Sequence, residues 1–215
     1  HFYYKNSSES TDKLHLTLIN ALENIAQRVL VCREYRCDKL YPALDRNGIG
    51  EMDDDYVHLI VVGMSPMGYA MATTAAHVCH FPNFYSKGIR TKITFIQENI
   101  HQEMDMFVSR YQNLFNLSYW RYIHFDDKSK NEEHFPEQDY ITCDSATESF
   151  DSKGFLDIEW EFIDGGIESQ SVRDYIKRCA GNEEEYLTIA LCDSETEKNV
   201  AASLCLPNEV YEKEI

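Results

Sequence analysis

The chain has 215 residues, of which 43% are hydrophobic and 27% are charged, and its formal net charge is −17. This length suits a single domain with one sizeable core. The strong negative charge argues against nucleic acid and anionic membrane surfaces as partners, because both attract clustered Lys and Arg.

The sequence contains no apolar run near the roughly 18 residues that span a bilayer, and no signal peptide. Seven cysteines, an odd number without a regular framework, indicate reduced thiols and a cytoplasmic location. Because the chain starts with His1 instead of methionine, we expect a piece of a longer protein or a processed terminus.

Residues 1–55 are expected to form an N-terminal helical extension and a linker. Apolar residues at helical spacing predict a helix from Lys13 to about Tyr35, capped by Ser10 or Thr11. Ile49 to Asp55 would then lead into the main domain, residues 56–215.

The most informative stretch runs from Val57 to His80. Val57 to Val62 is a short apolar run of the kind found in strands buried on both faces. The turn that follows has the spacing of the dinucleotide fingerprint G-x-G-x-x-G, with serine in the place of the middle glycine. Its residues are Gly63, Met64, Ser65, Pro66, Met67 and Gly68.

An Ala-rich helix is predicted after this turn. Ser65 has the side chain of an N-cap residue, and Pro66 is suited to the first helical position. Helix amides pointing at the turn would bind a phosphate. The alternative is a glycine turn that serves only strand–helix packing.

A second strand is predicted from Thr91 to Ile96, and Glu98 follows its end. In nucleotide-binding sheets an acidic residue at this position accepts hydrogen bonds from the adenosine ribose. The interval of 30 residues from Gly68 to Glu98 exceeds the usual one of about 20. A solvent-facing glutamate at a strand end is the alternative.

A helix is expected from Ile100, followed by an insertion over about residues 116–154. Its aromatic residues are interpreted as packing residues, with a hairpin tip near residues 128–133. His77, Cys79 and His80 do not predict a metal site, because His77 and Cys79 point in different directions on a helix. We therefore assign no metal ligand.

The remaining chain continues the alternation of strands and helices. Strands are predicted at 155–163 and 186–191, and a helix from Ser169 to Arg178. Asp164 ends the first of these strands, and Cys192 and Asp193 follow the second and open a last helix. The pattern predicts a Rossmann-like, doubly wound α/β fold with a mostly parallel sheet.

Four features together resemble TrkA-N modules, also called RCK (regulator of potassium conductance) domains. They are the turn GMSPMG, the acidic end of ITFIQE, the DGG turn, and the stretch LTIALCDSETEKNVAASLCL, in which Asn199 matches the family's asparagine. The resemblance covers about residues 57–207. Serine at the middle glycine position and the large insertion depart from the family pattern.

The resemblance implies a cytosolic regulatory module, usually dimeric, that binds NAD(H) or an adenine nucleotide and controls potassium transport. It implies that Gly63, Ser65 and Gly68 face the phosphates and Glu98 the ribose. It places Asp164 at the adenine-side turn, with Cys192 and Asp193 in the same site. The acidic Glu98 favours NAD over NADP.

No residue set has the pattern of a catalytic centre, which favours a sensor over an enzyme. The alternatives are a degenerate Rossmann scaffold that binds only protein, an NAD-dependent oxidoreductase and a methyltransferase. An oxidoreductase needs a separate substrate-binding half, and too few residues lie outside the predicted sheet to form one.

Overall fold

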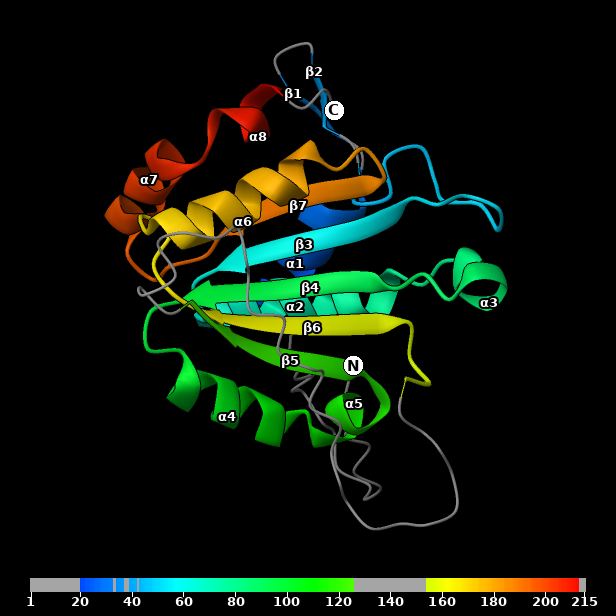
Figure 1. Cartoon of the computed structure of the whole chain (residues 1–215), viewed down its shortest axis with the longest axis horizontal. Coiled ribbons are helices and arrows are strands. Elements are labelled where there is room, and N and C mark those ends of the chain that lie inside the picture. Colours follow the sequence, from blue (N-terminus) through cyan, green and yellow to red (C-terminus); the bar gives the residue numbers. More distant parts are fainter. Residues whose placement is uncertain (1–19, 33, 37–38, 42, 126–153, 213–215) are drawn as a thin grey trace, which may run out of the picture.

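The structure is a computed structural model that describes residues 20–32, 34–36, 39–41, 43–125 and 154–212. Its centre is a five-stranded sheet with the order β5-β6-β4-β3-β7 (Figure 1). Every pair of neighbouring strands in it is parallel. The strands are β3 (Tyr56–Val62), β4 (Thr91–Gln97), β5 (Tyr119–His124), β6 (Ile158–Asp164) and β7 (Glu185–Leu191).

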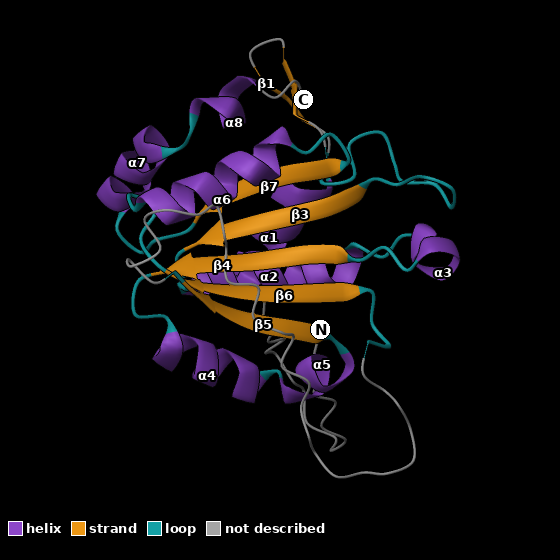
Figure 2. Ribbon diagram, viewed as in Figure 1, coloured by secondary structure: helices purple, strands orange, loops and turns teal. Residues whose placement is uncertain are grey.

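Helices cover both faces of this sheet, which confirms the predicted doubly wound α/β fold (Figure 2). One face carries α2 (Pro66–Val78), α4 (His101–Arg110) and α5 (Gln112–Leu117). The other carries α6 (Gln170–Gly181) and α7 (Thr196–Cys205). The short helices α3 (Asn83–Lys87) and α8 (Asn208–Glu212) complete the fold.

The two faces of the sheet form separate hydrophobic clusters. On the α2 face, Phe95, Phe107 and Trp160 are almost fully buried in a cluster that also includes Ala residues of α2. On the α6 face, Ile60, Ile96 and Ile176 form the second cluster. Alternate residues of each strand point to opposite faces, so both clusters draw on the same strands.

The N-terminal helix is shorter than predicted. Helix α1 spans Ala21–Val31, with Asn20 as its N-cap, and packs on α2. Residues up to Tyr35 do not continue it, because β1 (Glu34–Arg36) pairs with β2 (Lys39–Tyr41) in an antiparallel hairpin instead. The predicted start at Lys13 and the caps Ser10 and Thr11 lie outside the described residues.

The segment predicted to be an insertion, about residues 116–154, begins in the last turn of a helix and contains an additional strand. Helix α5 and strand β5 fall within residues 112–124, and β5 extends the sheet by parallel pairing with β6. Trp120 packs edge-to-face on Phe115, in agreement with a packing role for the aromatic residues. The expected hairpin tip at 128–133 lies outside the described residues, as does the rest of 126–153.

Candidate functional site

The carboxyl ends of the parallel strands meet at one edge of the sheet (Figure 1). The chain passes from β3 through α2 to β4 on one side, whereas α6 leads to β7 on the other side of β3. The end of β3 is therefore the point at which the strand order reverses. Open α/β sheets bind ligands in this position.

The glycine turn after β3 has the geometry expected of its first and last glycines. Gly63 has a φ angle of +97°, and a Cβ atom there would lie 2.9 Å from the backbone nitrogen of Asp193. A Cβ atom on Gly68 would collide with the carbonyl oxygen of Gly63. Contacts within the protein explain both glycines, so neither glycine alone indicates a ligand.

Ser65 and Pro66 begin α2 as predicted. The Ser65 hydroxyl accepts a hydrogen bond from the Gly68 amide at 3.2 Å, and Pro66 occupies the first turn. The Met64 amide donates to Gln97 Oε1 at 2.7 Å. Within the described part of the chain, no group accepts a hydrogen bond from the amides of Ser65 and Met67. These two amides are therefore available donors at the positive end of α2.

Glu98 follows β4, and its exposed side chain lies against Gly166 in the loop after β6. A Cβ atom on Gly166 would collide with Glu98 Oε1, so the loop approaches this carboxylate closely. The predicted ribose acceptor thus lies between the loops that follow β4 and β6.

Asp164 is held by neighbouring groups at the end of β6. Its carboxylate accepts from the Asn99 amide at 2.8 Å and from the Tyr122 hydroxyl at 3.1 Å, and it lies 3.5 Å from His124 Nδ1. Burial and this carboxylate raise the pKa of Tyr122 to about 12. Asp164 therefore joins β6 to β5 and to the loop after β4.

Cys192 and Asp193 lie beside the glycine turn. The buried Cys192 donates its amide to the Val62 carbonyl at 2.8 Å, and burial raises the pKa of its thiol to about 11. Asn199 brackets Asp193, because its Oδ1 accepts from the Asp193 amide and its Nδ2 donates to the Asp193 carbonyl, both at 2.8 Å. The structure thus places Cys192 and Asp193 with Gly63 and Gly68, and Glu98 and Asp164 in the loops after β4 and β6.

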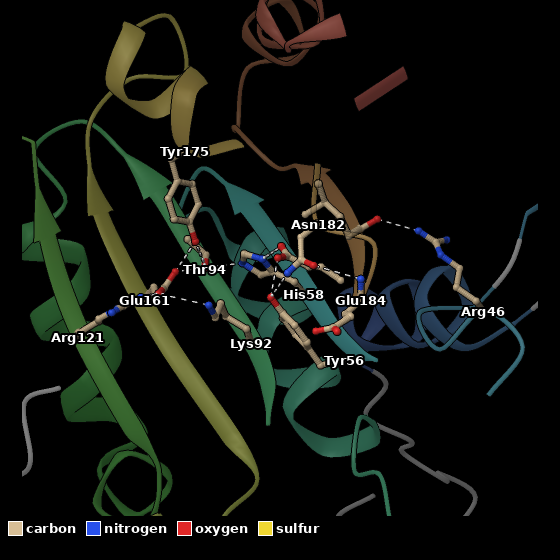
Figure 3. A network of polar contacts seen from close by, with 12 residues as sticks. Arg46, Tyr56, His58, Lys92, Thr94, Arg121, Glu161, Tyr175, Asn182 and Glu184 are labelled. Atoms are coloured by element: carbon tan, nitrogen blue, oxygen red, sulfur yellow. Dashed lines mark hydrogen bonds and ion pairs between the residues drawn. The ribbon is translucent and has the colours of Figure 1, made fainter. Parts of the chain in front are cut away.

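A second polar cluster lies on the α6 face, toward the amino ends of the strands (Figure 3). His58 on β3 contacts Glu185 on β7 through Nδ1, and its Nε2 lies 2.7 Å from Thr94 Oγ1 on β4. Thr94 donates to Glu161 Oε2 on β6 at 3.0 Å, and Arg121 Nε on β5 donates to Glu161 Oε1 at 2.8 Å. We call these five residues the cross-sheet network.

Further residues of α6, β3 and β4 surround this network. Tyr175 donates a hydrogen bond to Glu161, and Tyr56 donates to Glu185 Oε2 at 2.7 Å. Lys92 Nζ lies 3.8 Å from Glu161 Oε1. Burial together with the charge of Glu185 raises the pKa of the Cys179 thiol.

The charges in the network hold Glu161 ionised although it is fully buried. Burial alone would raise its pKa, but the positive charges of Lys92 and Arg121 outweigh burial and lower it to about 2. For Glu185, burial also acts to raise the pKa, and the hydrogen bond and charge of His58 outweigh it and lower the pKa. Both carboxylates are therefore paired and not isolated.

The sequence analysis did not identify this network. Its members are single polar residues within strands, and only the strand order brings them together. The interruption of an apolar run by His58, and Glu161 in an alternating strand, were the available signals.

The three residues that the sequence analysis rejected as metal ligands, His77, Cys79 and His80, have different environments. His80 Nδ1 lies 2.6 Å from Asp157 Oδ1, Cys79 is buried and His77 is exposed. Among the described residues, a different set, His58, Cys179 and Glu185, has potential ligand atoms that all lie within 4.8 Å of one another.

The fold and the turn after β3 define the chain as a Rossmann-like α/β protein. No family model matches the chain, and no curated protein or solved structure is significantly similar to it. Within the described ranges, none of the helices has the length and apolar character needed to cross a membrane.

Proposed function

We propose that the chain is a nucleotide-sensing regulatory module that binds NAD(H) or an adenine nucleotide at the carboxyl ends of β3, β4 and β6. The observation that carries this proposal is the pair of unpartnered amides, Ser65 and Met67, at the first turn of α2. They lie where the strand order reverses, and helix amides in that position bind phosphate.

Glu98 supports the adenosine end of this proposal. Its carboxylate is exposed in the loop after β4, and no hydrogen bond or ion pair to another described residue occupies it. A ribose placed there would donate its hydroxyls to Glu98, and the negative charge disfavours a 2′-phosphate. NAD is therefore preferred to NADP.

The resemblance of the glycine turn and of residues 187–206 to TrkA-N modules extends the proposal to regulation. On that basis the module acts as a homodimer within a longer protein linked to potassium transport. The exposed Val200 and Leu204 on α7 are consistent with an additional protein contact.

A degenerate scaffold that binds only protein is the second candidate. Two contacts favour it. Gln97 already accepts a hydrogen bond from the Met64 amide, and Ser65 places a side chain, bonded to the Gly68 amide, where the fingerprint has a glycine. Nucleotide titration separates the two candidates.

The test uses two substitutions of Ser65. Asp and Asn cap helices equally well, so Ser65→Asp and Ser65→Asn should both fold, but only the aspartate places a negative charge beside the phosphates. We expect calorimetry with NAD, NADH, ATP, ADP, AMP, cyclic di-AMP and S-adenosylmethionine to show micromolar binding of one or more adenine nucleotides. Ser65→Asp should weaken that binding at least tenfold more than Ser65→Asn.

Glu98→Gln is the companion variant for the ribose. A hydrogen bond to a charged group contributes about 1.5–3 kcal/mol, so this variant should bind NAD at least about tenfold more weakly while remaining folded. No binding across the panel by the folded wild-type chain would reject the proposal and favour the scaffold. Equal affinities of the two Ser65 variants would reject the phosphate site.

A further inference from the structure

Three side chains with metal-ligating atoms converge within the second polar cluster. His58 comes from β3, Cys179 from α6 and Glu185 from β7, and their exposed fractions are 0%, 7% and 3%. Their potential ligand atoms lie within 4.8 Å of one another. An imidazole and a carboxylate are costly to bury without partners. Here they contact each other, and both lie beside the Cys179 thiol.

We propose that His58, Cys179 and Glu185 form a zinc site that joins β3 and β7 to α6, with water in the fourth position. Nitrogen, sulfur and oxygen donors are the ligands that Zn²⁺ uses in proteins, usually in tetrahedral geometry. The thiol and imidazole exclude Mg²⁺ and Ca²⁺ as the preferred ions, since both favour oxygen ligands.

Two of the prospective ligand atoms must move apart for the ion to enter. His58 Nδ1 and Glu185 Oε1 are in hydrogen-bond contact, so a proton occupies the space between two prospective ligands. Metal–ligand bonds of about 2.0–2.1 Å at the tetrahedral angle require this pair to separate to about 3.3–3.4 Å. Zinc then replaces that proton, and the Cys179 thiol loses its own proton to solvent on coordination.

The surrounding hydrogen bonds already orient two of the ligands. With Nδ1 on the metal, the proton of His58 is on Nε2 and is donated to Thr94 Oγ1, which lies at 2.7 Å. Thr94 in turn donates to Glu161 at 3.0 Å. Tyr56 donates to the second oxygen of Glu185 at 2.7 Å. Outer hydrogen bonds of this kind fix ligand orientation at zinc sites.

Two anionic ligands, the Glu185 carboxylate and the Cys179 thiolate, would balance the charge of the divalent ion. The site lies toward the amino ends of the strands, whereas the nucleotide site lies at their carboxyl ends. The zinc proposal therefore does not rest on the proposed function, and either can fail alone.

The experiment compares wild-type protein with Cys179→Ala and Cys79→Ala after removal of metal by a chelator. Cys79 is a matched control because it is also a buried thiol, and it lies beside the rejected His77–His80 group. Zinc competition against a chromophoric chelator should give one equivalent bound by wild type and by Cys79→Ala. Cys179→Ala should bind at least 100-fold more weakly.

Cobalt substitution supplies a readout that does not depend on the folding of a variant. Wild-type protein loaded with Co²⁺ should show a thiolate-to-cobalt charge-transfer band together with tetrahedral d–d bands. Zinc should raise the melting temperature of wild type and of Cys79→Ala only, because a ligand that binds the folded state stabilises it. Absence of the thiolate band in wild type, or unchanged affinity in folded Cys179→Ala, would overturn the proposal.

Discussion

At the carboxyl ends of the strands most polar contacts join a side chain to a backbone group, whereas toward the amino ends, on the α6 face, they join side chains to one another. The turn after β3 combines a left-handed Gly63, a capped helix start and the bracketed backbone of Asp193. The cross-sheet network instead joins side chains from five neighbouring strands.

This difference determines what each region requires of the sequence. A backbone site needs glycine and a capping residue at fixed spacing along one stretch of chain. A side-chain network needs complementary partners on strands that are far apart in the sequence, and losing one partner leaves the others buried and unpaired. Single substitutions should therefore be more damaging in the network than at the turn.

The largest effect is expected for Glu161→Gln. This change leaves Arg121 and Lys92 beside a neutral group in a site where Glu161 is 0% exposed. Removing one partner of a buried ion pair costs about 3–5 kcal/mol, and the free energy of unfolding in urea should fall by about that amount. Glu168→Gln, in the exposed loop after β6, is the control and should change it by less than about 0.5 kcal/mol.

The same variant tests the pH dependence of the network. The pKa of Glu161 is lowered from 4.5 to about 2, so its contribution is complete above the unfolded-state pKa and is lost as pH falls toward 2. The stability difference between wild type and Glu161→Gln should therefore shrink between about pH 5 and pH 3. A difference that stays constant over this range would show that Glu161 does not act as a paired carboxylate.

An intermediate effect is expected for Gly68→Ala at the turn. Alanine normally stabilises a helix relative to glycine, but here its Cβ atom would collide with the Gly63 carbonyl oxygen. Overpacking of this kind costs about 1–3 kcal/mol. Thermal and urea unfolding should both report the loss.

Gly181→Ala is the matched control, at the end of α6. A Cβ atom there meets nothing within 4 Å, and Gly181 is not among the glycines with positive φ. The substitution should stabilise the protein by about 0.4–1 kcal/mol. If both variants shift stability in the same direction, the close approach of α2 to the end of β3 is not the reason for Gly68.

The comparison also explains which features could be predicted from the sequence. The five-residue spacing from Gly63 to Gly68, the Ser65 cap and the apolar strands are local patterns, and the structure contains all of them. Strand β5 was not predicted, because its aromatic residues and Arg121 precede a polar stretch and were interpreted as part of an insertion. The partner of Arg121, Glu161, lies 40 residues away in the sequence. The His58–Glu185 contact spans 127 residues, and only the strand order reveals it.

The smallest effect is expected for substitutions of Asn199. This residue matches the asparagine of TrkA-N modules, and its side chain hydrogen-bonds the backbone of Asp193. Asn199→Ala removes one acceptor and one donor from a half-buried pair of hydrogen bonds, so the free energy of unfolding should fall by about 1–2 kcal/mol. Asn199→Asp keeps the acceptor for the Asp193 amide but loses the donor to its carbonyl, and should lie between alanine and wild type. If aspartate destabilises the protein as much as alanine, the hydrogen bond from Asn199 Nδ2 to the Asp193 carbonyl is the one that stabilises the loop beside Gly63.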